Sequence, residues 1–172
     1  MSKKIVHVVG TGTIGEPLIG LLCDFKEQLG IDHVTFHKNT PLTKDRSKVI
    51  SLTKRGARLS THSDKFDGFE SIGLKPEYTT EEAIERATVV IDCTPSGFGH
   101  ENKAKYYNKF SSNTLGFVAQ GSEFGFGKPY ARGINDQTLV KGEDQFIQVV
   151  SCNTHNLSTL VDTIALSEGD DN

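Results

Sequence analysis

The sequence of 172 residues contains no tryptophan, one methionine, five prolines and three cysteines. No apolar run approaches the length of a membrane span, and Lys3 and Lys4 lead directly into an apolar segment, so we expect neither a membrane partner nor a signal peptide. A net charge of −3 gives no electrostatic reason to expect nucleic acid as a partner. These absences favour a cytoplasmic protein, and an apolar content of 35% is enough for one domain with a core.

Residues that bind metals are scattered along the chain. The cysteines, Cys23, Cys93 and Cys152, are too few and too far apart for a disulfide framework or a zinc cluster. The histidines show no metal-ligand spacing, so we expect no metal. Cys23, in an expected helix, and Cys93, in an expected Val-Val-Ile strand, are interpreted as small buried apolar residues.

Glycine, in contrast, is frequent near the start of the chain, where Gly10, Gly12 and Gly15 follow the apolar run 5–9. In a turn that binds a dinucleotide, the first glycine permits the tight turn, the second lets the backbone approach the pyrophosphate, and the third lets the helix close on the strand. N–H groups at the helix start bind anionic oxygens. A glycine turn without a ligand gives the same pattern, but the flanking segments favour a dinucleotide. The residues expected to bind the cofactor here are Gly10, Gly12, Thr13, Ile14 and Gly15.

Beyond this turn, strand-like and helix-like segments alternate, which predicts a parallel sheet with crossover helices. Thr79 to Glu82 has the pattern of a helix capping box. The polar segment 61–76 fits neither type of element, and the glycine-rich segment 120–144 is interpreted as a loop with at most short pieces of structure. The predicted fold class is α/β, a Rossmann-type NAD(P)-binding domain with a mostly parallel sheet. Strands are expected at 5–9, 34–37, 89–93, 115–119 and 145–150, and helices from about 15, at 44–55, 79–87 and 101–110, and around 157–165.

The end of the second strand bears on cofactor preference. Enzymes selective for NAD usually carry an acidic residue there to bind the ribose 2′-hydroxyl. This strand ends in His37-Lys38-Asn39, without a carboxylate. Lys38 could pair with a 2′-phosphate or could be a solvated loop lysine. We therefore expect NADP to bind at least as well as NAD.

Cys152 immediately follows the last expected strand and precedes an amphipathic helix. A sulfur near a helix N-terminus lies close to unpaired N–H groups, which favour a thiolate. Position alone leaves both a catalytic thiol and an ordinary thiol open.

Four segments together resemble the amino-terminal half of the archaeal-type (type II) glyceraldehyde-3-phosphate dehydrogenases, in matching order and spacing over the whole chain. They are the opening glycine turn, Asp92-Cys-Thr-Pro-Ser-Gly97, Gln120-Gly-Ser-Glu123 and Ser151-Cys-Asn-Thr154. The resemblance implies NADP or NAD as cofactor, with further binding residues Thr94, Pro95, Gly97, Gln120 and Gly121.

The resemblance also implies a phosphorylating aldehyde oxidation. Cys152 would attack the aldehyde of glyceraldehyde 3-phosphate, hydride would pass to the nicotinamide, and inorganic phosphate would release 1,3-bisphosphoglycerate from the thioester. Backbone N–H groups around Cys152 and Asn153 would hold the developing oxyanion. Ser151, Asn153 and Thr154 would line a phosphate pocket at the helix start.

Two departures from the family pattern matter. His155-Asn156 stands where the pattern usually has Thr-Gly, and His155 is not interpreted as the catalytic base, because the family's base comes from a second, catalytic domain. The resemblance divides the chain into a dinucleotide-binding domain, 1–152, and a helix, 153–172, that leads toward a catalytic domain absent from this sequence. We expect the chain alone to bind nucleotide and to catalyse poorly or not at all, and the full-length protein to be a homo-oligomer, a tetramer by family resemblance. A related semialdehyde or acyl-phosphate dehydrogenase and a non-catalytic nucleotide-binding module remain as alternatives.

Overall fold

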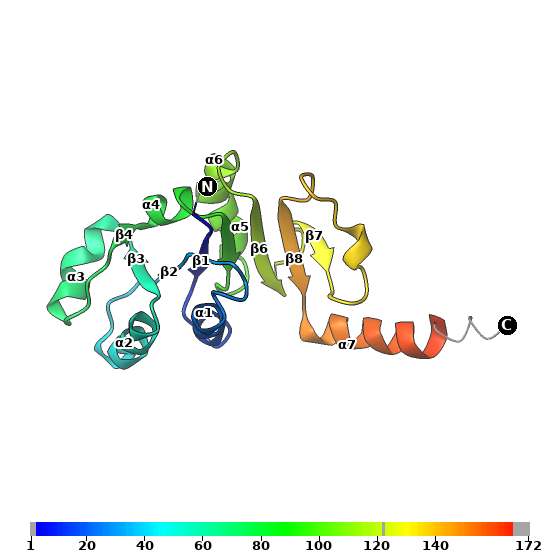
Figure 1. Cartoon of the computed structure of the whole chain (residues 1–172), viewed down its shortest axis with the longest axis horizontal. Coiled ribbons are helices and arrows are strands. Elements are labelled where there is room, and N and C mark those ends of the chain that lie inside the picture. The colour runs from blue at the N-terminus through cyan, green and yellow to red at the C-terminus, as the bar shows by residue number, and fades with distance from the viewer. Residues whose placement is uncertain (1–2, 122, 167–172) are drawn as a thin grey trace.

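The computed structural model describes residues 3–121 and 123–166, which form one parallel sheet with helices on both faces (Figure 1). The strand order is β4-β3-β2-β1-β5-β6-β8-β7, and every neighbouring pair is parallel. The predicted Rossmann-type α/β fold is confirmed. The strands are β1 (Ile5–Val9), β2 (His33–His37), β3 (Arg58–Thr61), β4 (Tyr78–Thr79), β5 (Val89–Asp92), β6 (Gly116–Gly121), β7 (Lys128–Tyr130) and β8 (Phe146–Val150).

The helices mostly connect these parallel strands. α5, η3 and α6 follow one another without a break and form one continuous helical segment, residues 98–110. No helix among the described residues is long and apolar enough to cross a membrane. The helices are α1 (Gly15–Asp24), η1 (Thr43–Asp45), α2 (Arg46–Lys54), η2 (Ser63–Lys65), α3 (Phe66–Ser71), α4 (Thr80–Glu85), α5 (Phe98–Asn102), η3 (Lys103–Tyr107), α6 (Asn108–Phe110), η4 (Asp136–Thr138), α7 (Cys152–Val161) and η5 (Asp162–Leu166).

β1 is the central strand, and all five of its residues are buried. It pairs with β2 on one side and β5 on the other, so the chain order reverses at the β1/β5 pair. In open parallel sheets a ligand binds outside the carboxyl ends of the strands at such a reversal. The topology therefore places a candidate site above the carboxyl ends of β1 and β5.

Two apolar clusters cover the two faces of the sheet. One contains residues of α1, α2 and α3, and the other contains residues of α4, η3 and α6. In the second cluster Tyr107 stacks on Phe117 with ring centroids 5.0 Å apart. Burial on both faces explains why β1 is a continuous apolar run, interrupted only by His7.

Several local predictions are confirmed, and others are wrong. The capping box is present: the Thr79 hydroxyl accepts from the Glu82 N–H, and the Glu82 carboxylate accepts from the Thr79 N–H. The described residues of 120–144 contain only short elements, as predicted: the end of β6, the three-residue edge strand β7, which is interrupted by Pro129, and η4. The unassigned segment 61–76 contains α3, and Cys93 lies just beyond β5 and is only half-buried.

Candidate dinucleotide site

A pocket of about 720 Å³ lies at the carboxyl ends of β2, β1, β5 and β6. It crosses the β1/β5 reversal, which is the position that the topology favours. Its lining residues are Thr11, Gly12, Thr13, Ile14, His37, Lys38, Asn39, Thr40, Leu42, Cys93, Thr94, Pro95, Ser96, Gln120 and Gly121.

The three glycines of the opening turn have three different geometries. Gly10 has φ +99°, a conformation that side chains rarely adopt, and a Cβ there would lie 3.0 Å from the Cys93 carbonyl oxygen. A Cβ on Gly15 would collide with the Gly10 carbonyl. A Cβ on Gly12 would meet no protein atom within 4 Å, and Gly12 lines the pocket. The open space at Gly12 is where a pyrophosphate would need the backbone to be free of a side chain.

Helix α1 begins directly after this turn, with Ile14 as its N-cap. Among the described residues, no side chain caps this end of the helix. Thr13 and Ile14 line the pocket, so the first turn of α1 borders it. A helix start of this kind offers N–H groups and the positive end of the helix dipole to an anion. The geometry fits a dinucleotide.

Lys38 lies at the end of β2 and lines the same pocket. Its side chain is 9% exposed, and its Nζ lies 2.7 Å from Asp45 Oδ2. Lys38 is therefore not a solvated loop lysine. The hydrogen bond from Lys38 lowers the pKa of Asp45. β2 itself ends without a carboxylate, and the one that contacts Lys38 belongs to Asp45 on η1. This carboxylate does not line the pocket.

A smaller cavity of about 280 Å³ adjoins the main pocket and shares His37, Asn39 and Thr94 with it. Inside it, the Thr80 hydroxyl lies 3.0 Å from His62 Nδ1 and 3.4 Å from His37 Nδ1. Burial lowers the pKa of His37 to about 3, and it also lowers the pKa of His62. Both imidazoles are therefore neutral near pH 7, and the cavity presents polar but uncharged rings.

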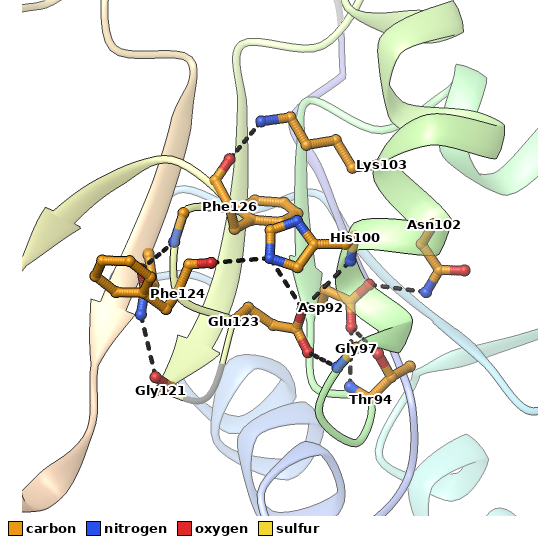
Figure 2. A network of polar contacts seen from close by, with 12 residues as sticks. Asp92, Thr94, Gly97, His100, Asn102, Lys103, Gly121, Glu123, Phe124 and Phe126 are labelled. Carbon is orange, nitrogen blue, oxygen red and sulfur yellow. Dashed lines mark hydrogen bonds and ion pairs between the residues drawn. The ribbon is translucent and has the colours of Figure 1, made fainter.

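The turn after β5 supplies the next part of the pocket wall (Figure 2). The Asp92 carboxylate accepts a hydrogen bond from the Thr94 N–H at 2.9 Å and another from the Thr94 hydroxyl. Its second oxygen accepts from Asn102 at 2.9 Å and from the Tyr107 hydroxyl at 2.5 Å. Thr94, Pro95 and Ser96 line the pocket, whereas Gly97, also expected to bind the cofactor, is not part of this lining.

The β6 end of the pocket lies close to Ser151, the residue before the cysteine. Gln120 and Gly121 line the pocket, and a Cβ on Gly121 would lie 3.3 Å from Ser151 Cα. Ser151 caps α7, because its hydroxyl accepts from the Thr154 N–H at 3.2 Å. Cys152 is the first residue of α7 and is exposed, with its sulfur 4.0 Å from Asn153 Oδ1. The expected phosphate-binding residues, Ser151, Asn153 and Thr154, therefore lie together at a helix start beside the pocket but outside its lining.

Comparisons with known proteins identify relatives of this chain. No protein-family model matches the chain. A glyceraldehyde-3-phosphate dehydrogenase of Pyrobaculum islandicum is 29% identical over 164 residues, and one of Archaeoglobus fulgidus is 29% identical over 169 residues; each alignment covers 94% of this chain and 44% of the relative. One of Methanobacterium bryantii is 31% identical over 138 residues, which cover 70% of this chain and 39% of that protein.

The chain is related to archaeal glyceraldehyde-3-phosphate dehydrogenases. It spans less than half the length of these curated relatives, as expected for a match to an amino-terminal half. The resemblance recognised in the motifs is thereby confirmed.

Within this glyceraldehyde-3-phosphate dehydrogenase relative, His155 has a structural contact. Its Nε2 lies 3.0 Å from the carbonyl oxygen of Arg132, so this nitrogen is the hydrogen-bond donor. Donation from Nε2 fixes the tautomer in which Nδ1 is the unprotonated nitrogen, and it anchors the ring on the loop after β7.

Sequence reasoning did not assign several residues that shape the site. Thr11, Asn39 and Ser96 are pocket residues next to assigned ones, and Thr40 lies two residues after Lys38, so their neighbours in the sequence were a usable signal. Asp92 and Glu123 act from outside the lining, through hydrogen bonds to the turn after β5. Both occur in motifs that carry the family resemblance, which was the only sequence signal for them.

Proposed function

We propose that this chain is the dinucleotide-binding part of an NAD(P)-dependent, phosphorylating glyceraldehyde-3-phosphate dehydrogenase. The observation that carries this proposal is the glycine turn: Gly10 and Gly15 are closed against the protein, while Gly12 opens into the pocket. That division of roles is the one a pyrophosphate requires. The relatives' names support the reaction type.

The chain's own residues would divide the chemistry as follows. A bound nicotinamide would accept the hydride. The Cys152 thiolate attacks the aldehyde carbon of glyceraldehyde 3-phosphate, and the N–H groups at the start of α7 hold the oxyanion. Loss of hydride leaves a thioester on Cys152. Inorganic phosphate then displaces the sulfur and gives 1,3-bisphosphoglycerate, with Ser151, Asn153 and Thr154 binding phosphate at the same helix start.

Domain organisation follows from the same proposal. Residues 1–152 form the dinucleotide-binding domain, and residues 153–172 begin the connection to a catalytic domain that supplies the general base. The exposed apolar residues of α7 and η5 support this assignment, because no residue of either is buried. They are Leu157, Leu160, Val161, Ile164 and Leu166, while residues 167–172 lie outside the described part of the chain.

Lys38 is proposed to favour NADP. Its ammonium has three N–H donors, and Asp45 takes one of them, so two remain for a 2′-phosphate. Asp45 also holds the side chain in place, which reduces the entropy lost when the phosphate binds. NADP should therefore bind at least as tightly as NAD.

The deciding experiment is a titration of the protein with NADP and with NAD. The Lys38→Ala variant should bind NADP about tenfold more weakly, because a charge-assisted hydrogen bond is lost, and should bind NAD as the wild type does. Lys44→Ala, which removes an exposed neighbouring charge on η1, is the matched control. Failure of the wild type to bind either dinucleotide would contradict the proposed function. Unchanged NADP affinity in Lys38→Ala would contradict only the role of the lysine.

A further inference from the structure

Glu123 is a carboxylate buried beside the pocket, with 3% of its surface exposed. It follows β6, and its side chain reaches across to the turn between β5 and α5 (Figure 2). Its Oε1 accepts from the Gly97 N–H at 2.6 Å, and its Oε2 accepts from the His100 N–H at 3.3 Å. A buried carboxylate with two backbone donors is a strong tether between two loops.

The tether acts at the start of the helical segment 98–110. Gly97 is the N-cap of α5, and as a glycine it has no side chain that could accept a hydrogen bond from the first N–H groups of the helix. Glu123 takes that place from another loop and puts negative charge at the positive end of the helix dipole. A second hydrogen bond joins the same two segments, because His100 Nε2 donates to the carbonyl oxygen of Phe124, the residue after Glu123, at 3.0 Å.

The fit between Glu123 and the helix start is close. A Cβ on Gly99 would lie 2.9 Å from Glu123 Cγ and 3.0 Å from Cδ. Gly97 has φ +91°, so its N–H is directed by a conformation that other residues rarely adopt. The carboxylate therefore has one defined position against this turn.

The other end of the same turn is held separately. The turn 94–97 is held by a hydrogen bond at each end: Asp92 accepts from the Thr94 N–H, and Glu123 accepts from the Gly97 N–H. The first three residues of this turn, Thr94, Pro95 and Ser96, line the pocket. Moving Gly97 away from Glu123 would change the shape of this wall.

The wall belongs to one end of the pocket. Lys38 lies at the β2 end, whereas Gln120 and Gly121 lie at the β6 end, next to Ser151. In the proposed enzyme the reacting ring must lie near Cys152, which follows Ser151. The nicotinamide half therefore belongs at the β5 and β6 end, and the adenosine half at the Lys38 end.

We propose that Glu123 is a positioning residue that fixes the turn 94–97 for the nicotinamide half of the dinucleotide. This inference rests on the proposed function, since it assumes that a nicotinamide dinucleotide occupies the pocket. Glu123 acts through the turn and does not itself line the pocket. Its loss should therefore weaken binding of the whole dinucleotide more than binding of the adenosine half.

The test compares two ligands on the full chain: NADP, and adenosine 2′,5′-bisphosphate, which lacks the nicotinamide half. In Glu123→Gln the carboxamide keeps one acceptor but directs an N–H₂ group at a backbone N–H. NADP should then bind about tenfold more weakly, while the bisphosphate should bind within about twofold of wild type. Glu123→Asp, whose carboxylate is one methylene too short to reach both N–H groups, should give the same selective loss and serves if the glutamine variant does not fold.

Glu85→Gln removes an exposed carboxylate on α4 and should change neither affinity. Equal losses for NADP and the bisphosphate in the Glu123 variants would indicate general damage to the fold and would overturn the proposal. Wild-type affinity for NADP in these variants would overturn it as well, and would leave the proposed function intact. If the wild type binds no dinucleotide, the proposed function fails first and this inference fails with it.

Discussion

The two ends of the candidate site are built in opposite ways. At the glycine turn, the proposed binding depends on backbone: Gly10 and Gly15 are closed against their surroundings, and the space at Gly12 is kept open. At the start of α7, the proposed chemistry depends on an exposed side chain, Cys152, beside a helix face that is also exposed. The first end is completed by residues of this chain, whereas the chemistry proposed at the second needs groups beyond the described ones. The proposed binding and the proposed catalysis should therefore be separable by experiment.

The sharpest test of this difference is the reactivity of the three thiols. Burial raises the pKa of Cys93 from 9.0 to about 12 and also raises the pKa of Cys23. Three pKa units mean roughly a thousandfold less thiolate at neutral pH. We expect iodoacetamide to label Cys152 at least about a hundredfold faster than Cys93, and also faster than the buried Cys23, as followed by peptide mass spectrometry. Equal labelling rates would favour a non-catalytic nucleotide-binding module.

A second test uses pH to probe two buried histidines of the strands that lead to the glycine-turn end of the site, His7 on β1 and His37 on β2. Burial lowers the pKa of His7 and of His37 to about 3, whereas both should titrate near 6.5 in the unfolded chain. Between these values the unfolded state binds more protons, so stability is present above about pH 6.5 and is lost as the pH falls toward 3.

Each of these two histidines should contribute roughly 1.4 kcal/mol of lost stability per pH unit in that window. Urea unfolding measured at pH 7, 6 and 5 gives the slope, and His37→Gln should reduce it. An identical slope in the wild type and the variant would show that His37 does not contribute. His33, which is much less buried, provides the matched comparison.

A third test separates two glycines of the same turn. Gly15→Ala should lower the free energy of unfolding by about 3 kcal/mol, because the new methyl group collides with the Gly10 carbonyl. Gly12→Ala should leave stability within about 0.5 kcal/mol of wild type, since nothing lies within 4 Å of its Cβ. It should nevertheless weaken dinucleotide binding by about tenfold, because the methyl group enters the pocket. Urea unfolding and dinucleotide titration measure the two effects, and equal stability losses would contradict the assigned difference.

Local signals were sufficient for much of the fold. The capping box at Thr79 and the strand, turn and helix around Gly10 depend on residues close together in the sequence, so their patterns are readable without tertiary context. β7 could not be predicted in this way. It has three residues, one of them a proline, and exists because β8 offers a free edge for pairing.

The parts of the site that escaped prediction depend on distant contacts. Glu123 meets Gly97 across 26 residues, only because β5 and β6 are neighbours in the sheet. Lys38 was recognised from its place at a strand end, but its partner Asp45 lies on a separate short helix, and its burial follows from that fold. Strand ends indicate where a site lies, while the polar contacts that arrange it require the assembled sheet.

The pairing of β6 with β8 has a further consequence for the cysteine. Gly121 is in register with Val150, two residues before Cys152, and without a side chain it lets Ser151 approach closely. The β6/β8 register therefore fixes the position of the sulfur. A shift of one residue would move it by roughly 3.3 Å along the strand and would turn the side chains of β8 to the opposite face of the sheet. The distance between the Cys152 thiol and the pocket wall at Gly121 is thus set by the hydrogen bonds of two strands, more rigidly than a loop could set it.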